Sequence, residues 1–197
     1  MGLQELGARI WLEPNDDPNR KLDYSWKLVE LEGGHMAGID TALPNRIVSE
    51  ALDKGRIPEL SEYPLVRSEV RYGNASRIDF LLSASGKPDA YVEVKNVTLS
   101  RQPGLAEFPD SVTKRGTKHL HDLARMTAQG YRAVMLYLVQ RSDCRRFSLA
   151  EDIDPDYAEA YCAATLAGVE TLCYEAALST ESVTLGTPIQ VDVDGNV

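Results

Sequence analysis

The feature that most constrains the fold is an unbroken apolar run at residues 133–139, AVMLYLV. The run is far shorter than the ~20 apolar residues that a membrane-spanning helix needs. A short run without polar alternation is typical of a β-strand that is buried on both faces, as in α/β proteins. The sequence therefore predicts a sheet that has helices packed against it.

The pattern around this run favours an α/β fold with a mixed sheet. From residue 43 onward the predicted order is helix, three strands, helix, strand, helix and strand. The three consecutive strands are joined by turn-forming residues, so we expect them to form an antiparallel meander. The predicted strands lie at 66–72, 77–83, 89–97, 132–139 and 169–176.

Capping residues mark the three helices. Asn45 is predicted to cap the first helix and Gly55 to end it. The second helix is expected at about 113–129. Asp154 is predicted to cap the third helix, which ends at Gly168.

Two segments show a different pattern. Short β-forming runs at 9–12, 24–31 and 36–40 precede the first helix and are separated by turn residues. Residues 99–112 contain two prolines and a glycine, and we expect them to form a loop.

The charge of the chain is unevenly distributed. The 197 residues carry a formal net charge of −9, which taken alone argues against nucleic-acid binding. However, residues 64–146 hold 14 basic and 8 acidic side chains, whereas residues 147–197 hold 10 acidic and no basic ones. This asymmetry favours a polyanion-binding segment in the middle of the chain. The alternative is a solvated surface of mixed charge.

Strand alternation is predicted to gather acidic residues on the meander. Residues two apart share a face of a strand, so Glu93 and Lys95 lie together on the third strand. Asp79 and Glu69 occupy the matching positions on the neighbouring strands. The residues expected on the opposite, core face of the second strand are Ile78, Phe80 and Leu82.

Such a cluster needs a cation. Two carboxylates ~4 Å apart repel each other by about 4 kcal/mol at an effective dielectric constant near 20. Either Lys95 or a metal ion must offset this repulsion, and Mg²⁺ suits the site because it takes only one or two protein carboxylates. A metal held in this way can polarise a phosphoryl oxygen and supply a nucleophilic water. The alternative is an ordinary ion pair between Glu93 and Lys95.

The second predicted helix carries a basic stripe. Lys114, Lys118, His121 and Arg125 follow helical spacing and would suit a substrate whose phosphates need neutralising. A solvated helix face is the alternative. His119 and His121 are two residues apart and point in different directions on a helix, so we do not expect them to bind metal.

The sequence lacks several common motifs. It contains no GxxxxGK[ST], GxGxxG, GxSxG or HExxH pattern. Cys144, Cys162 and Cys173 form no CxxC pair, which argues against a disulfide scaffold and a structural zinc site. The N-terminus shows no signal-peptide pattern, so we expect a cytoplasmic protein with no membrane partner.

Four segments occur in a characteristic order: EVRYGNASRIDFLL, YVEVKNVTL, FPDSVTKRGTKHL and GYRAVMLYLVQR. Taken together they resemble the sugar fermentation stimulation protein (SfsA) family. The resemblance implies a restriction-endonuclease-like domain of the PD-(D/E)xK superfamily, joined to an N-terminal OB-like β-barrel. It also implies DNA binding and a link to the regulation of sugar (maltose) metabolism.

Carried over from the family, the acidic and lysine positions fall on Asp79, Glu93 and Lys95. Glu69 resembles an additional acidic residue, and Arg115 and Lys118 resemble helix residues on the substrate side. Members of the family have a longer N-terminal segment, so we expect an incomplete barrel. The expected division is a partial OB-like segment at 1–41 and a nuclease-like domain at 42–197.

Two main hypotheses follow. The first is a DNA-binding protein with an Mg²⁺- or Mn²⁺-dependent nuclease site. In it Asp79, Glu93 and Glu69 hold the metal and Lys95 positions or activates water, while the DNA contacts come from Lys114, Arg115, Lys118 and Arg125. The second is a DNA-binding transcriptional regulator without turnover. A third hypothesis, a metal-free protein-interaction module, is favoured only by the negative net charge of the whole chain. The sequence does not decide between endonuclease and exonuclease action, and it allows a homodimer.

Overall fold

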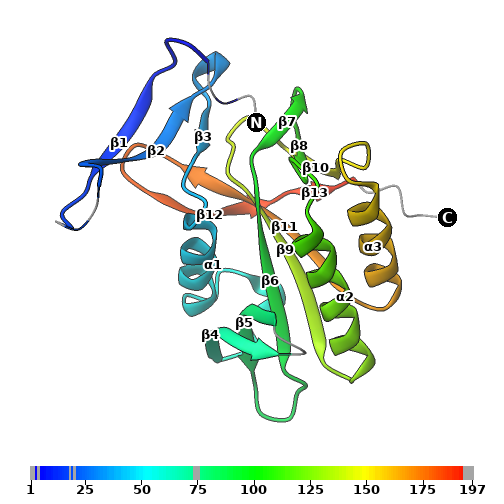
Figure 1. Cartoon of the computed structure of the whole chain (residues 1–197). Helices are drawn as coiled ribbons and strands as arrows, with labels where there is room; N and C mark the ends of the chain where they lie inside the picture. Colours follow the sequence, from blue (N-terminus) through cyan, green and yellow to red (C-terminus); the bar gives the residue numbers. More distant parts are fainter. Residues whose placement is uncertain (1–2, 4, 18, 20, 73–75, 193–197) are drawn as a thin grey trace.

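A six-stranded mixed sheet forms the centre of the molecule in the computed structural model, which describes residues 3, 5–17, 19, 21–72 and 76–192 (Figure 1). Its strand order is β12-β11-β9-β6-β5-β4. The predicted α/β class is therefore confirmed. The strands are β4 (Leu65–Tyr72), β5 (Ser76–Ser83), β6 (Ala90–Val97), β9 (Arg132–Val139), β11 (Glu170–Leu178) and β12 (Val183–Pro188).

The strand pairing agrees with the sequence pattern. β4, β5 and β6 form the expected antiparallel meander, and β9 pairs in parallel with both β6 and β11. Residues 133–139 of β9 are all buried, because neighbouring strands flank β9 and helices cover both faces of the sheet.

Helices cover the two faces of the sheet unequally. α1 (Leu43–Asp53) packs on one face, and α2 (Lys114–Ala128) and α3 (Pro155–Leu166) pack on the other (Figure 1). Successive β9 residues alternate between the two cores that result. Two short 3₁₀ helices lie at Glu32–Gly34 and Pro58–Leu60.

Two capping predictions have different outcomes. Asp154 accepts the N–H of Tyr157 at 3.1 Å and caps α3, as predicted. The prediction that Asn45 caps the first helix is wrong, because the helix begins two residues earlier, after Ala42. Asn45 lies in the first turn, and its side chain is therefore free to reach the sheet.

The prediction that one face of β5 holds all its core residues is also wrong. Ile78 belongs to the core beneath α2, whereas Phe80 and Leu82 belong to the core beneath α1. The regular ladder between β5 and β6 pairs only residues 80–82 with 90–92. Beyond these pairs the Asp79 carboxylate, in place of a backbone carbonyl, accepts the N–H of Val94. The simple alternation of side chains is lost at this interruption.

An open three-stranded antiparallel sheet is formed by β1 (Ile10–Pro14), β2 (Tyr24–Glu30) and β3 (Met36–Gly38). It joins the larger sheet through Gly38, whose N–H donates to the Gln140 carbonyl at 2.9 Å. A Cβ at position 38 would lie 2.5 Å from Oε1 of the buried Gln140, so a larger residue would have to displace that side chain.

A third sheet replaces part of the loop expected at 99–112. Its strands are β7 (Leu99–Gln102), β8 (Leu105–Phe108), β10 (Arg146–Leu149) and β13 (Gln190–Val191). The Pro and Gly signals at 103–104 mark the turn between β7 and β8 rather than a long loop. In the part of the chain that the structure describes, no helix is long and apolar enough to span a membrane.

Candidate metal and nucleic-acid site

Asp79, Glu93 and Lys95 come together at the point where the β5–β6 ladder is interrupted. They line a hollow of about 440 Å³ to which the start of α1 and the first half of α2 also contribute. Glu93 and Lys95 project from the α2 side of β6, because the alternate residues Val92 and Val94 belong to the α1-side core. The other lining residues are Thr41, Ala42, Asn45, Val94, Arg115 and His119.

Glu93 is the most deeply buried group of the site, with 3% of its surface exposed. Nζ of Lys95 lies 2.8 Å from Oε1 of Glu93, and Nδ1 of His119 contacts the same oxygen. Burial raises the pKa of Glu93, but His119 and Lys95 outweigh this and hold it below its usual value. Oε2 of Glu93 is buried and has no hydrogen-bond partner among the described residues.

Asp79 is held by two neutral donors. Oδ1 accepts a hydrogen bond from Nδ2 of Asn45 at 2.8 Å, and Oδ2 accepts one from the backbone N–H of Val94 at 2.7 Å. Burial, and next the charge of Glu93, raise the pKa of the Asp79 carboxyl. Within the described residues no cationic side chain lies within 4.0 Å of it. An ion pair of Asp79 therefore does not explain why this carboxylate is here.

His119 was missed by sequence reasoning. The prediction that His119 and His121 point in different directions is confirmed, because His121 is exposed and His119 is buried. However, Nδ1 of His119 lies 3.1 Å from Nζ of Lys95, and its Nε2 accepts from Nε of Arg115 at 3.4 Å. The missed signal was its position four residues before Leu123, on the buried face of the helix.

Glu69 does not join the other acidic residues. It is exposed and does not line the hollow, and its Oε2 lies 3.8 Å from NH1 of Arg77. Its backbone has a φ of 56°, in the left-handed region that residues other than glycine rarely adopt.

The four α2 residues predicted to contact DNA are exposed. Lys114, Arg115, Lys118 and Arg125 all reach solvent, and Arg115 also lines the hollow. Arg125 differs from the others because it pairs with the buried carboxylate of Asp122. Three of the four cations are therefore available to a polyanion beside the site.

The residues present fit a hard divalent cation. The described residues contain no group of three or more His, Cys, Asp or Glu side chains arranged around one metal position. An ion such as Mg²⁺ does not need one, because it keeps several waters and takes one or two carboxylates. Asp79 and the unpartnered Oε2 of Glu93 supply such a pair.

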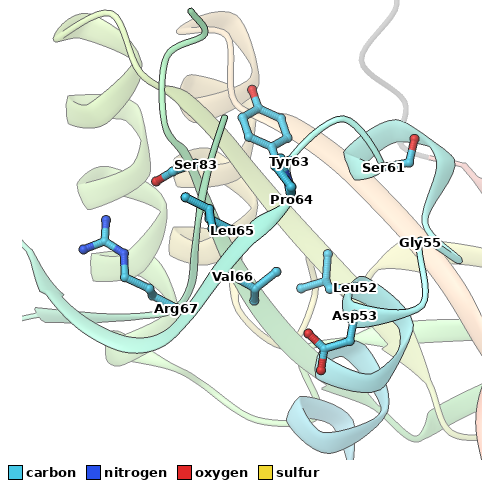
Figure 2. Close-up of a pocket in the computed structure, with 10 residues that line it drawn as sticks. All are labelled: Leu52, Asp53, Gly55, Ser61, Tyr63, Pro64, Leu65, Val66, Arg67 and Ser83. Atoms are coloured by element: carbon cyan, nitrogen blue, oxygen red, sulfur yellow. The ribbon is translucent and has the colours of Figure 1, made fainter. Parts of the chain in front are cut away.

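A more spacious hollow lies elsewhere and lacks this chemistry. It has a volume of about 750 Å³ and lies between the end of α1 and β4 (Figure 2). Figure 2 shows mainly apolar and hydroxyl side chains around it, with one carboxylate, Asp53, and one guanidinium, Arg67. Its lining therefore offers neither a pair of carboxylates for a metal ion nor a pair of cationic side chains for a phosphate.

Comparisons with known proteins agree on one family. The family model described as "Sugar fermentation stimulation protein RE domain" matches residues 42–182. A sugar fermentation stimulation protein homolog of Dinoroseobacter shibae is 60% identical over 192 residues, which cover 98% of this chain and 79% of the relative. One from Roseobacter denitrificans is 58% identical over 191 residues, covering 97% and 81%.

A solved structure has the same fold. It is described as Pyrococcus furiosus SfsA in complex with Ca²⁺, and it matches with a TM-score of 0.83 and 26% identity, over 93% of this chain and 77% of that one. Together with the family match and the two close relatives, this shows that the chain belongs to the sugar fermentation stimulation protein (SfsA) family.

Proposed function

We propose that this chain is a DNA-binding phosphodiesterase that depends on Mg²⁺ or Mn²⁺. The observation that carries the proposal is the Glu93 carboxylate, which is buried with one oxygen unpartnered and shares a hollow with Asp79 and Lys95. A buried acceptor without a partner costs about 1–3 kcal/mol, so native proteins rarely keep one without a reason. A bound cation supplies that reason.

Each residue of the hollow has a role in this proposal. Asp79 and Glu93 hold the ion, which would polarise a phosphoryl oxygen and acidify a bound water. The hydrogen bonds from Asn45 and from the Val94 N–H fix the orientation of Asp79. Lys95, whose side chain is 12% exposed, orients the attacking water or stabilises charge that develops on the phosphate.

Two further observations support the proposal. A related structure was obtained with Ca²⁺, a hard divalent cation that prefers oxygen ligands as Mg²⁺ does. Lys114 and Lys118 are exposed and are sequence neighbours of Arg115 and His119, which line the hollow, and a substrate with several phosphates would need such cations.

A DNA-binding transcriptional regulator of sugar metabolism is the second candidate. The exposed basic stripe of α2 favours it, because phosphate contacts of this kind need no metal and no turnover. The two candidates share the DNA contacts and differ in whether the carboxylate pair is used.

The test is incubation with linear, nicked and single-stranded DNA, in Mn²⁺ or in EDTA, followed by gel electrophoresis. We expect nicking or degradation in Mn²⁺ only, a large loss of rate in Lys95→Ala, and little change in its DNA affinity. Lys54→Ala is the matched control, because Lys54 is exposed just after the far end of α1. DNA binding without cleavage of any substrate would favour the regulator, and cleavage in EDTA would refute the metal site.

A further inference from the structure

The β4–β5 hairpin carries two arginines directly opposite each other. Arg71 and Arg77 are cross-strand partners in the antiparallel ladder, and both are exposed. Like charges at such positions destabilise a sheet. Arg77 has one acidic neighbour, Glu69, and no described acidic residue lies within 4.0 Å of Arg71. The pair therefore presents more positive charge than its surroundings neutralise.

The position of Arg77 connects this pair to the candidate metal site. Arg77 and Asp79 lie two residues apart on β5, a step of about 7 Å along a strand. The residues that alternate with them point toward α2, because Ile78 lies in the α2-side core and Ser76 donates a hydrogen bond to Asp122. Arg77 therefore lies on the other side of β5, and the hydrogen bond from Asn45 of α1 draws the Asp79 carboxylate to that side as well.

Cations thus approach the carboxylates from two elements. Arg115 of α2 lines the hollow that holds Asp79 and Glu93. Arg77 lies one two-residue step from Asp79 toward the N-terminal end of β5. A strand of DNA bound at the hollow would therefore have guanidinium groups of both elements within reach.

Glu69 contributes to this arrangement through Arg77. Its left-handed backbone and its exposed side chain place its carboxylate beside the guanidinium rather than in the hollow. Because no third acidic residue joins Asp79 and Glu93 among the described residues, Glu69 has no visible part in holding a metal there.

We propose that Arg71 and Arg77 bind a DNA phosphate next to the one that reacts at Asp79 and Glu93, and that Glu69 positions Arg77. This inference rests on the proposed function, because it takes DNA as the ligand. A guanidinium can donate two parallel hydrogen bonds to a phosphate, which suits recognition of a backbone without regard to sequence. A phosphate between the two arginines also removes their mutual repulsion.

The test is fluorescence anisotropy with a labelled DNA duplex in EDTA, over a series of NaCl concentrations. Each phosphate contact adds about 0.9 to the slope of log K against log salt. Because the two arginines share one phosphate, we expect the double variant Arg71→Ala/Arg77→Ala to lower the slope by about 0.9 and each single variant to lower it by no more than that. Arg56→Ala is the matched control, because Arg56 is exposed beyond the far end of α1 and should leave the slope unchanged.

Glu69→Gln separates positioning from metal binding. We expect it to weaken DNA binding in the parent but to have no further effect on top of Arg77→Ala. It should also keep the rise in melting temperature that Mn²⁺ gives the parent, whereas Glu93→Gln should lose that rise. The role given to Glu69 would be overturned if Glu69→Gln and Arg77→Ala weakened DNA binding by fully additive amounts. It would also be overturned if Glu69→Gln lost the rise in melting temperature with Mn²⁺.

The remaining outcomes distinguish this inference from the proposed function. If the parent cuts DNA while the double arginine variant keeps the parental slope, the arginine pair is wrong and the nuclease proposal stands. If the parent binds DNA without cutting it and the slopes fall as expected, the arginine pair stands and the nuclease proposal fails. A parent that binds no DNA at any salt concentration overturns both.

Discussion

Asp79→Asn is the substitution that most directly tests the metal site. Without metal the variant should be at least as stable as the parent, whereas with metal it should be less stable than the parent. The pKa of Asp79 is raised in the folded protein, so folding disfavours the ionised form. The stabilisation by the bound proton is complete below the unfolded pKa of about 3.9 and is lost as pH rises through the raised folded value. At neutral pH the metal-free protein therefore carries an unfavourable charge that asparagine removes.

Without metal, Asp79→Asn should change the free energy of unfolding only slightly. The amide oxygen of asparagine can still accept the Val94 N–H, and rotation of the Asn45 amide lets its oxygen accept from the new NH₂ group. If that second hydrogen bond is lost, the variant loses about 0.5–1.5 kcal/mol of stability. Removal of the unfavourable negative charge at position 79 offsets this loss. We therefore expect the variant to be as stable as the parent in EDTA, or more stable.

With metal, the expected difference in stability between the parent and Asp79→Asn is larger. At a metal concentration of 100 times the dissociation constant, binding stabilises the parent by about 2.7 kcal/mol. In a protein of this size each kcal/mol moves the melting temperature by about 2–4 °C, so the parent should gain about 5–11 °C. Asp79→Asn removes one of the two carboxylates that hold the ion, and we expect it to lose most of this gain.

Thermal melts in EDTA and in Mn²⁺ measure both effects, with Asp53→Asn as the control. Asp53 is an exposed residue at the last position of α1, so its substitution should leave the metal effect intact. An Asp79→Asn variant that is clearly destabilised in EDTA, together with a parent indifferent to Mn²⁺, would refute the metal-site reasoning.

Three further predictions concern other parts of the molecule. Lys118→Ala should weaken all DNA sequences alike and lower the salt slope by about 0.9, and an unchanged slope would make the exposed stripe of α2 a solvated face. Gly38→Ala should destabilise the protein by about 1–3 kcal/mol in urea unfolding, because the new Cβ would lie 2.5 Å from Oε1 of the buried Gln140; no loss would mean that the Gln140 side chain moves aside at little cost. Although burial raises the pKa of Asp143, Arg141 holds it below its usual value, so its stabilisation is present above pH ~3.9 and is lost as pH falls through the lowered value. Asp143→Asn should therefore be less stable than the parent at pH 7, and the difference should shrink in acid melts; a pH-independent difference would contradict this.

The parts of the fold that the sequence predicts are those in which local and tertiary preferences agree. The apolar run of β9 has one consistent location, a strand covered on both faces. The Asp154 cap and the following Pro155 favour a helix start by local hydrogen bonding alone. The shorter strands β7, β8, β10 and β13 were not predicted, because pairing with distant segments decides a strand of two to four residues.

The site was predicted in part for the same reason. Alternation correctly placed Glu93 and Lys95 together on β6, where the ladder with β9 is regular. Alternation failed for Glu69, because it assumes an extended backbone and this residue has a φ of 56°. The role of Asn45 was misread, because its distance from Asp79 is set by how α1 packs on the sheet and not by local sequence.

The interruption of the β5–β6 ladder explains why a carboxylate stands at position 79. The Val94 N–H no longer has a backbone acceptor there, and the Asp79 carboxylate replaces that acceptor. Asp79 therefore completes the sheet and also supplies a candidate metal ligand beside Glu93. Replacing Asp79 with alanine would leave the Val94 and Asn45 donors without their acceptor, at about 1–3 kcal/mol for each group that stays buried. Loss of activity in Asp79→Ala would thus mix loss of metal with loss of structure, whereas Asp79→Asn keeps an acceptor for Val94 and removes the charge.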